Sequence, residues 1–167
     1  MGVSRKRRLA LLATVVLGIA LVGAACGEPP PPPAHCPTGP QDAITSTIYS
    51  RTNIDRKVIA NYGPLWWDAG LACNAQDWAN AMASSGNFSH QNLGGLIRTS
   101  GYSNFASLGE NILVGPGGMT GDAIHVAWMN SPGHYANIMG WYDSIGIAIA
   151  YGPDGRVWAT EEFGRHF

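Results

Sequence analysis

The chain has 167 residues, a length that fits one domain of ordinary size. Four of its ten basic residues lie within the first eight positions, and all eleven acidic residues lie after position 26, so the chain beyond that point carries six minus eleven, or −5, with neutral histidines. An acidic domain without a basic cluster argues against nucleic acid as a partner and against attachment to anionic lipid through a charged face.

The first 25 residues have the layout of a secretory signal peptide. Four basic residues at positions 5–8 precede an apolar run over 9–25, which ends in small side chains. An uncleaved signal anchor is the alternative, although the run is shorter than the roughly 20 residues of a stable membrane span. We therefore expect the rest of the chain to lie outside the cytoplasm.

Cys26 follows the apolar run, and residues 21–26 resemble a bacterial lipobox, in which the cysteine is lipidated and becomes the new N-terminus. Gly23 stands where an aliphatic residue is usual, so cleavage before an unmodified Cys26, which would give a secreted protein, remains the alternative. Lipid chains on Cys26 would supply the two signals that stable membrane anchoring needs.

Residues 26–40 read as the lipidated cysteine and a proline-rich linker, which leaves 41–167 as the folded domain. Five consecutive prolines at 29–33 favour an extended spacer of about 3 Å per residue. Cys36 and Cys73 remain once Cys26 is assigned to lipid, and in an oxidising compartment they could form a disulfide. Two free thiols are the alternative.

Helical patterns come first along the domain. Helices are predicted over residues 41–60, 68–85, 120–130 and 132–139. Asp68 and Thr120 can cap the second and third helices, Gly86 can end the second, and Pro132 suits the first turn of the fourth. In the third helix, Ile124, Ala127 and Trp128 are expected to face inward, and His125 is expected to be structural.

The period then changes to that of strands. Over 145–150, isoleucine alternates with glycine or alanine, which predicts a strand with one face of small residues. A turn signal at 153–155 precedes a second strand over 156–163. Helices followed by antiparallel strands indicate an α+β fold.

Five motifs in register resemble the CAP superfamily, which groups cysteine-rich secretory proteins, antigen 5 and pathogenesis-related proteins with bacterial SCP-like domains. The motifs are Asn53-x-x-Arg56, Pro64-Leu65-Trp66-Trp67-Asp68-x-x-Leu71, Phe88-Ser89-His90, Gly109-Glu110-Asn111-Ile112 and Trp128-Met129-Asn130-Ser131-Pro132-Gly133-His134-x-x-Asn137-Ile138. The resemblance implies a three-layer α-β-α sandwich with a central antiparallel sheet. It also implies a cleft where His90, Glu110 and His134 meet.

Two imidazoles and a carboxylate are a common ligand set for Zn²⁺, and they can also perform general acid–base chemistry near neutral pH. His90, Glu110 and His134 are therefore the candidate metal ligands and the candidate catalytic residues, with Zn²⁺ as the expected ion. A hydrogen-bonded structural network is the alternative. No nucleophile stands out, because Ser131 suits a helix cap better than a pairing with His134.

Many eukaryotic relatives carry a second acid in a Trp-x-x-Glu pattern, which is absent after Trp128. Asp122 and Glu161 are the substitutes considered. We expect a binding module for a metal ion, for a small apolar or lipid ligand, or for another component of the cell envelope. A metal-assisted hydrolase of peptide or cell-wall substrates and a structural surface protein are the alternatives.

Overall fold

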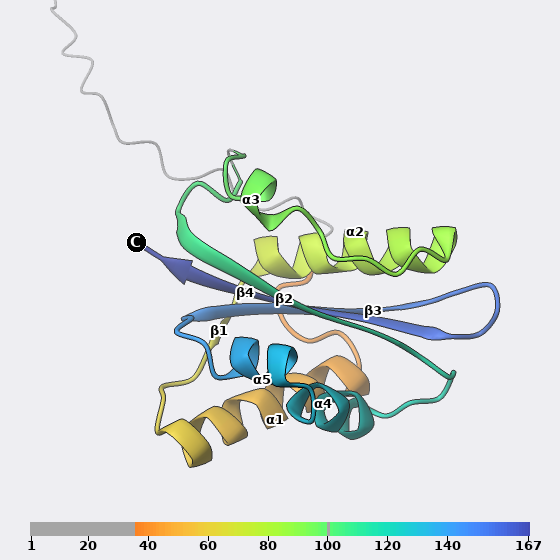
Figure 1. Cartoon of the computed structure of the whole chain (residues 1–167), viewed down its shortest axis with the longest axis horizontal. Helices are drawn as coiled ribbons and strands as arrows, with labels where there is room; N and C mark the ends of the chain where they lie inside the picture. Colours follow the sequence, from red (N-terminus) through yellow and green to blue (C-terminus); the bar gives the residue numbers. More distant parts are fainter. Residues whose placement is uncertain (1–35, 100) are drawn as a thin grey trace, which may run out of the picture.

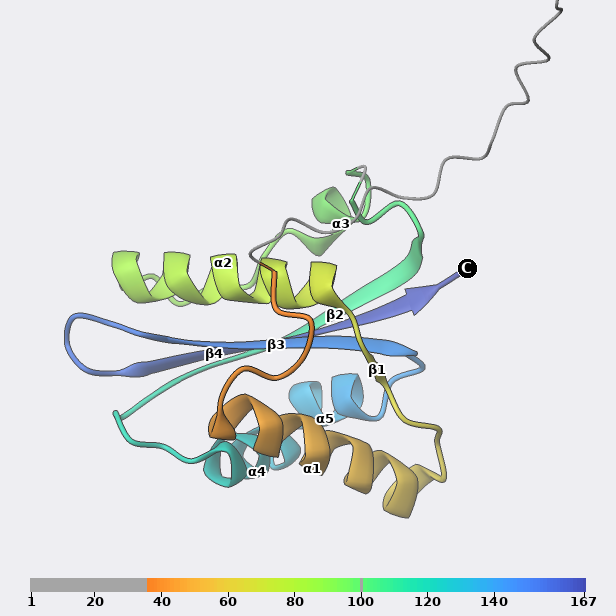
Figure 2. The same ribbon diagram turned by 180° about the vertical axis from the view of Figure 1, so that it is seen from behind.

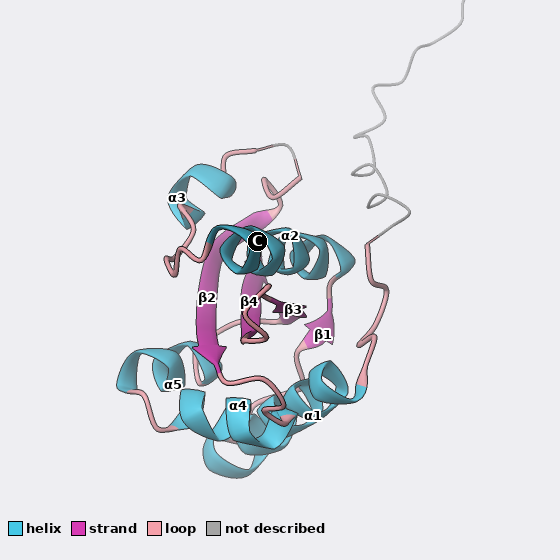
Figure 3. Cartoon of the chain, turned by 90° about the vertical axis from the view of Figure 1, so that its right-hand side faces the viewer, coloured by secondary structure: helices cyan, strands magenta, loops and turns pink. Residues whose placement is uncertain are grey.

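The computed structural model describes residues 36–99 and 101–167. Its centre is a sheet with the strand order β1-β3-β4-β2, formed by β1 (Trp66–Trp67), β2 (Phe105–Gly115), β3 (Ser144–Tyr151) and β4 (Val157–His166). One face is covered by α2 (Ala69–Ser85), with the short α3 (Leu93–Leu96) beside it. The other face is covered by α1 (Ala43–Ala60), α4 (Gly121–Met129) and α5 (Pro132–Ile138), as Figures 1 and 2 show. Figure 3 shows the same three layers from the side, which confirms the predicted α-β-α sandwich.

The sheet differs from the expected one at its β1 edge. β4 pairs antiparallel with β3, as predicted, and also with β2, which was not predicted as a strand, whereas β1 joins β3 in parallel through Trp66↔Ser144. A parallel pair needs a long crossover between its strands, and the chain between β1 and β3 supplies one. β1 was not predicted, because two residues are too few to show a period.

Two helices, α2 and α4, begin at the predicted caps. The Asp68 carboxylate accepts from the Leu71 amide at 2.8 Å, and the Thr120 hydroxyl accepts from the Ala123 amide at 3.2 Å. Gly86 ends α2 in the left-handed conformation at φ 71°. Ser131 takes the expected N-cap position of α5, before Pro132 in the first turn, but its side chain makes no capping hydrogen bond.

The two faces of β3 explain how closely α2 approaches the sheet. Ile145 and Ile147 pack with the core on the α1 side, whereas Ala148 and Ala150 pack against the alanines of α2. Gly146 lies so close to α2 that a Cβ atom there would be 2.1 Å from the Ala72 nitrogen. The predicted strand with one face of small residues is confirmed. The residues on that face are small because α2 packs closely against them.

One inward residue of α4 was predicted wrongly. Ile124 and Trp128 are buried as expected, but Ala127 is exposed and His125 takes an inward position. His125 can do so because Asp55 and Thr52 of α1 give both of its ring nitrogens polar neighbours. The expectation that His125 is structural fits this burial.

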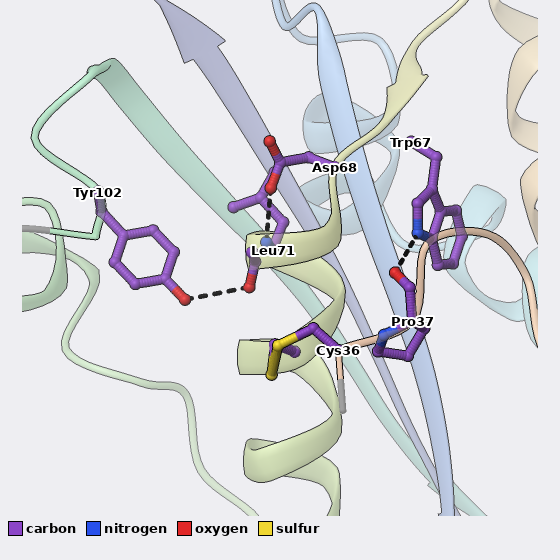
Figure 4. The surroundings of a disulfide bond; sticks show 8 residues. Cys36, Pro37, Trp67, Asp68, Leu71 and Tyr102 are labelled. Atoms are coloured by element: carbon purple, nitrogen blue, oxygen red, sulfur yellow. Dashed lines mark hydrogen bonds between the residues drawn. A yellow bond between two sulfur atoms is a disulfide. The ribbon is translucent and has the colours of Figure 1, made fainter. Parts of the chain in front are cut away.

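A disulfide between Cys36 and Cys73 ties the start of the described chain to α2. Figure 4 shows it beside a second attachment, in which the Trp67 indole donates to the Pro37 carbonyl at 2.8 Å. In the same view, the Tyr102 hydroxyl donates to the Gly70 carbonyl at 3.1 Å and holds the segment before β2 against α2. The predicted disulfide is confirmed.

Within residues 36–99 and 101–167, no helix has the length and apolar character needed to cross a membrane. The predicted signal peptide, Cys26 and the five prolines fall outside the described residues.

Candidate functional site

The predicted cleft lies at β2, which is the edge strand of the sheet. Glu110 lies on β2, His90 lies in the segment between α2 and α3, and His134 lies on α5. The two histidines therefore come from opposite outer layers and approach β2 from its two sides. This arrangement brings together elements that are far apart in the chain.

Glu110 holds His90 in a fixed orientation. The Glu110 side chain is 1% exposed, and its Oε1 atom lies 2.7 Å from Nδ1 of His90, whose side chain is 58% exposed. The Gln91 backbone N–H also donates to Oε1, at 3.1 Å, and the Gln91 side-chain amide donates to Oε2, at 3.0 Å. A carboxylate with these donors keeps Nδ1 of His90 occupied and leaves Nε2 as the atom that can bind something else.

The His134 side of the cleft is attached through α5. The Asn137 amide donates to the Glu110 carbonyl at 2.9 Å, and the Asn111 amide donates to the His134 carbonyl at 3.2 Å. Burial lowers the pKa of His134, and the neighbouring His90 lowers it further. His134 is therefore held toward its neutral form, which is the form that can act as a ligand or a base.

The acid next to Glu110 is Glu162 rather than either of the two substitutes considered. Glu162 is the register partner of Glu110 on β4, and Gln91 bridges the two by also donating to Glu162 Oε1 at 2.6 Å. Asn74 of α2 donates to the same oxygen. Burial raises the pKa of Glu162 to about 8, against the hydrogen bond from Gln91, so this carboxyl is mostly protonated at neutral pH.

The two substitutes considered, Asp122 and Glu161, lie elsewhere. Asp122 forms an exposed ion pair with Arg51, with 2.7 Å between Arg51 Nε and Asp122 Oδ1. Glu161 is the register partner of Asn111 and faces the α1 layer, opposite Glu162. Adjacent residues of a strand point to opposite faces of the sheet. The Glu161-Glu162 pair in the sequence therefore indicates one acid on each face, but only the strand register shows which of the two meets Glu110.

Residues 36–99 and 101–167 contain no group of three or more His, Cys, Asp or Glu side chains close enough to hold a metal ion together. The Glu110 carboxylate is directed at His90 and Gln91 rather than outward. In this arrangement Glu110 orients the His90 ring, and the two imidazoles are the groups left to bind an ion.

An open groove of ≈ 490 Å³ lies apart from this cleft, on the outer side of α1. Its lining consists of Tyr49, Ile54 and Val58 and of the polar side chains Ser50, Asn53 and Lys57.

Solved structures share the fold of this chain. An outer surface protein of Borrelia burgdorferi has the same fold, with a TM-score of 0.63 and 21% identity over 74% of this chain and 93% of that chain. An extracellular protein containing an SCP domain from Bacillus anthracis matches with a TM-score of 0.56 and 26% identity. That match covers 72% of this chain but only 39% of the Bacillus anthracis chain.

Sequence comparison identifies the family. The model of the cysteine-rich secretory protein family, CAP, matches residues 51–163, and the chain belongs to this family. Pathogenesis-related leaf protein 4 of Solanum lycopersicum is 30% identical over 126 residues, which are 66% of this chain and 69% of that protein. The resemblance drawn from the five motifs is confirmed.

Proposed function

We propose that this chain is an extracytoplasmic binding domain whose cleft holds a divalent transition-metal ion, Zn²⁺ foremost, through His90 and His134. One observation carries the proposal: a buried carboxylate, Glu110, holds Nδ1 of a solvent-exposed histidine. Carboxylate–histidine pairs of this kind are the usual support of metal-bound imidazoles. The lowered pKa of His134 supports a role as a metal ligand, because a protonated imidazole cannot bind a metal.

Equilibrium dialysis of the purified domain against Zn²⁺ tests the proposal. We expect one ion per chain, retained by His166→Gln, in which a histidine paired with Asp143 is removed. His90→Ala and His134→Ala are expected to abolish binding, and Glu110→Gln is expected to weaken it by roughly 10–100-fold through lost orientation. A wild-type protein that takes up no Zn²⁺, with histidine variants that lose only stability, would make the cleft structural.

The same purified protein can be used to test the hydrolase alternative. Hydrolysis would need the ion to activate water beside the cleft, so peptide and cell-wall substrates should be cleaved only by the loaded wild-type protein. No observation in the described part of the chain favours this activity over binding.

A small apolar ligand is the second candidate, because the groove on α1 exposes Ile54 and Val58 beside Tyr49. We propose a single acyl chain as its occupant. A fluorescent fatty acid should bind the wild type but not the Ile54→Asp variant. The Ser46→Asp variant, changed at an exposed position of the same helix, should bind it like the wild type. Equal binding by both variants would show that the groove is not the binding site.

The extracytoplasmic location is proposed from the predicted signal peptide and disulfide, and from the surface and extracellular relatives. Lipid attachment at Cys26 is a separate proposal, which would make the membrane a partner of the linker rather than of the domain. Metabolic palmitate labelling should mark the wild type and not Cys26→Ser. Unlabelled protein free in the medium would show that the chain is secreted without a lipid.

A further inference from the structure

A second set of buried polar side chains lies under the cleft, on the α1 side of the sheet, and the proposed metal site does not use it. Glu161 and Thr52 are 0% exposed and His125 is 2% exposed. Together with Asp55 and Asn111 they make a continuous path, here called the Glu161 network. Buried groups of this kind are costly unless each donor and acceptor is matched.

One half of the network runs from Glu161 to the seam between α1 and α4. The Thr52 hydroxyl donates to Glu161 Oε1 at 2.9 Å and lies 3.4 Å from Nδ1 of His125. The other ring nitrogen, Nε2, lies 2.9 Å from Asp55 Oδ2. The Asp55 side chain is 28% exposed, so this half of the network ends at solvent.

The other half runs from Glu161 to the cleft. The Asn111 amide donates both to Glu161 Oε2, at 3.0 Å, and to the His134 carbonyl, at 3.2 Å. The Asn111 oxygen accepts from Asn137, which also donates to the Glu110 carbonyl. The carboxyl of Glu161 thus contacts the strand that carries Glu110 through Asn111, and the same Asn111 amide links it to the helix that carries His134.

The charges around Glu161 come from three elements. Arg56 of α1 approaches it, but the guanidinium Nη atoms donate to the carbonyls of Ile138, Gly140 and Tyr142 instead. Asp55 lies beyond His125 of α4, and α5 contributes His134. Burial raises the pKa of Glu161 to about 7, against the hydrogen bonds from Thr52 and Asn111 and the charge of Arg56.

The Thr52 hydroxyl has one hydrogen and two neighbours that can accept it. If Glu161 is ionised, Thr52 donates to it, and a protonated His125 can donate from Nδ1 to the Thr52 oxygen. If the Nδ1 proton passes to the Thr52 oxygen while the hydroxyl proton passes to Glu161, the carboxyl becomes neutral and His125 becomes neutral as well. Both arrangements contain the same protons, and both satisfy all three side chains.

We propose that Glu161 and His125 share one proton through the hydroxyl of Thr52, and that this shared proton makes Glu161 a pH-sensitive positioning residue for α5. An ionised carboxylate binds the Asn111 amide more strongly than a neutral carboxyl does. The hold of Asn111 on the His134 carbonyl therefore changes with the proton on Glu161. The inference does not rest on metal binding, and its test uses the metal-free domain.

Nuclear magnetic resonance of the histidine ring nitrogens, the glutamate side-chain carboxyl carbons and the asparagine side-chain amides tests the proposal between pH 4 and 9. In the wild type, the signals of the His125 ring, the Glu161 carboxyl and the Asn111 amide should change together over one pH interval. Thr52→Ser keeps a hydroxyl and should keep this common step. Thr52→Val should separate the His125 and Glu161 steps by about one pH unit, a typical size for a coupling between neighbouring ionisable groups.

Glu161→Gln supplies the second test, because its amide can donate to Thr52 as a neutral carboxyl does. The Asn111 amide signal should then lose its pH step, which a merely structural Glu161 would not cause. Identical His125 signals in the wild type, Thr52→Val and Glu161→Gln would overturn the proposal. If a variant does not fold, the wild type alone decides, because separate intervals for His125 and Glu161 would also overturn it.

Discussion

At the scale of single residues, the two glutamates on the α2 face of the sheet have different tasks. Glu110 is directed at His90, whereas Glu162 accepts from Asn74 and Gln91 in a site that water does not reach. Gln91 joins the two, because its side-chain amide donates to both carboxyls. Burial, together with the nearby charge of Glu110, keeps the proton on Glu162.

The raised pKa of Glu162 predicts that stability falls as pH rises. The folded chain holds this proton up to about pH 8, whereas the unfolded chain releases it near the ordinary value of 4.5, so the folded state binds more protons between these values. Urea unfolding of the wild type should show a free energy of unfolding that declines over this interval. Glu162→Gln should flatten the decline.

Asp154→Asn is the control for that experiment, because it removes a carboxylate from an exposed pair with Arg156 and should leave the decline unchanged. An equal decline in wild type and Glu162→Gln would show that another group is responsible, with Glu161 as the next to examine.

At the scale of elements, residues whose role is confined to a single helix or strand were predictable from the sequence. Asp68, Thr120 and Gly86 act within one helical turn, and the alternation over 145–150 needs only a strand with two different faces. The partner of Glu110 was not predictable, because it depends on the register between β2 and β4. Nor was the inward position of His125, which depends on the approach of α1 to α4.

The motifs predicted a cleft where His90, Glu110 and His134 meet, and the structure places them on elements that meet at β2. Glu110 was expected as a ligand, and in the structure its two oxygens accept from His90 and Gln91. Ligand geometry depends on side-chain rotamers that a linear motif does not contain.

The close contact of α2 with β3 predicts a strong effect of one methyl group. Gly146→Ala would place a Cβ atom 2.1 Å from the Ala72 nitrogen and 2.3 Å from the Leu71 carbonyl carbon. Backbone atoms cannot move aside as a side chain can, so the free energy of unfolding should fall by about 3 kcal/mol or more. Thermal unfolding followed by circular dichroism measures the loss.

Gly63→Ala is the matched control for this change, since nothing lies within 4 Å of its Cβ position. Its stability should stay within about 0.5 kcal/mol of the wild type or rise slightly. Similar losses in both variants would mean that α2 does not pack on β3 at Gly146.

At the scale of the whole molecule, the disulfide decides where the chain enters the domain. Cys36 and Cys73 are 37 residues apart, and the bond holds the segment before α1 against α2, on the opposite side of the sheet from α1. A linker that begins at the membrane would therefore meet the domain on its α2 side.

Loss of this disulfide should lower the free energy of unfolding by about 2–4 kcal/mol, because the unfolded chain regains the freedom of the closed loop. Urea unfolding of Cys36→Ser/Cys73→Ser measures the difference from the wild type. The reduced wild type should match the double variant. Equal stability of oxidised and reduced protein would show that the bond does not brace the fold.

The proposed metal site requires that the cleft presents two imidazoles outward, one of them held by Glu110. Histidine ring ¹⁵N resonances during a Zn²⁺ titration at pH 7.5 test this arrangement. We expect that Nδ1 of His90 carries the proton toward Glu110, and that Zn²⁺ shifts Nε2 of His90 and a ring nitrogen of His134 together, with one ion per chain. Zn²⁺ that leaves both rings unshifted, or that shifts only His166, would contradict it.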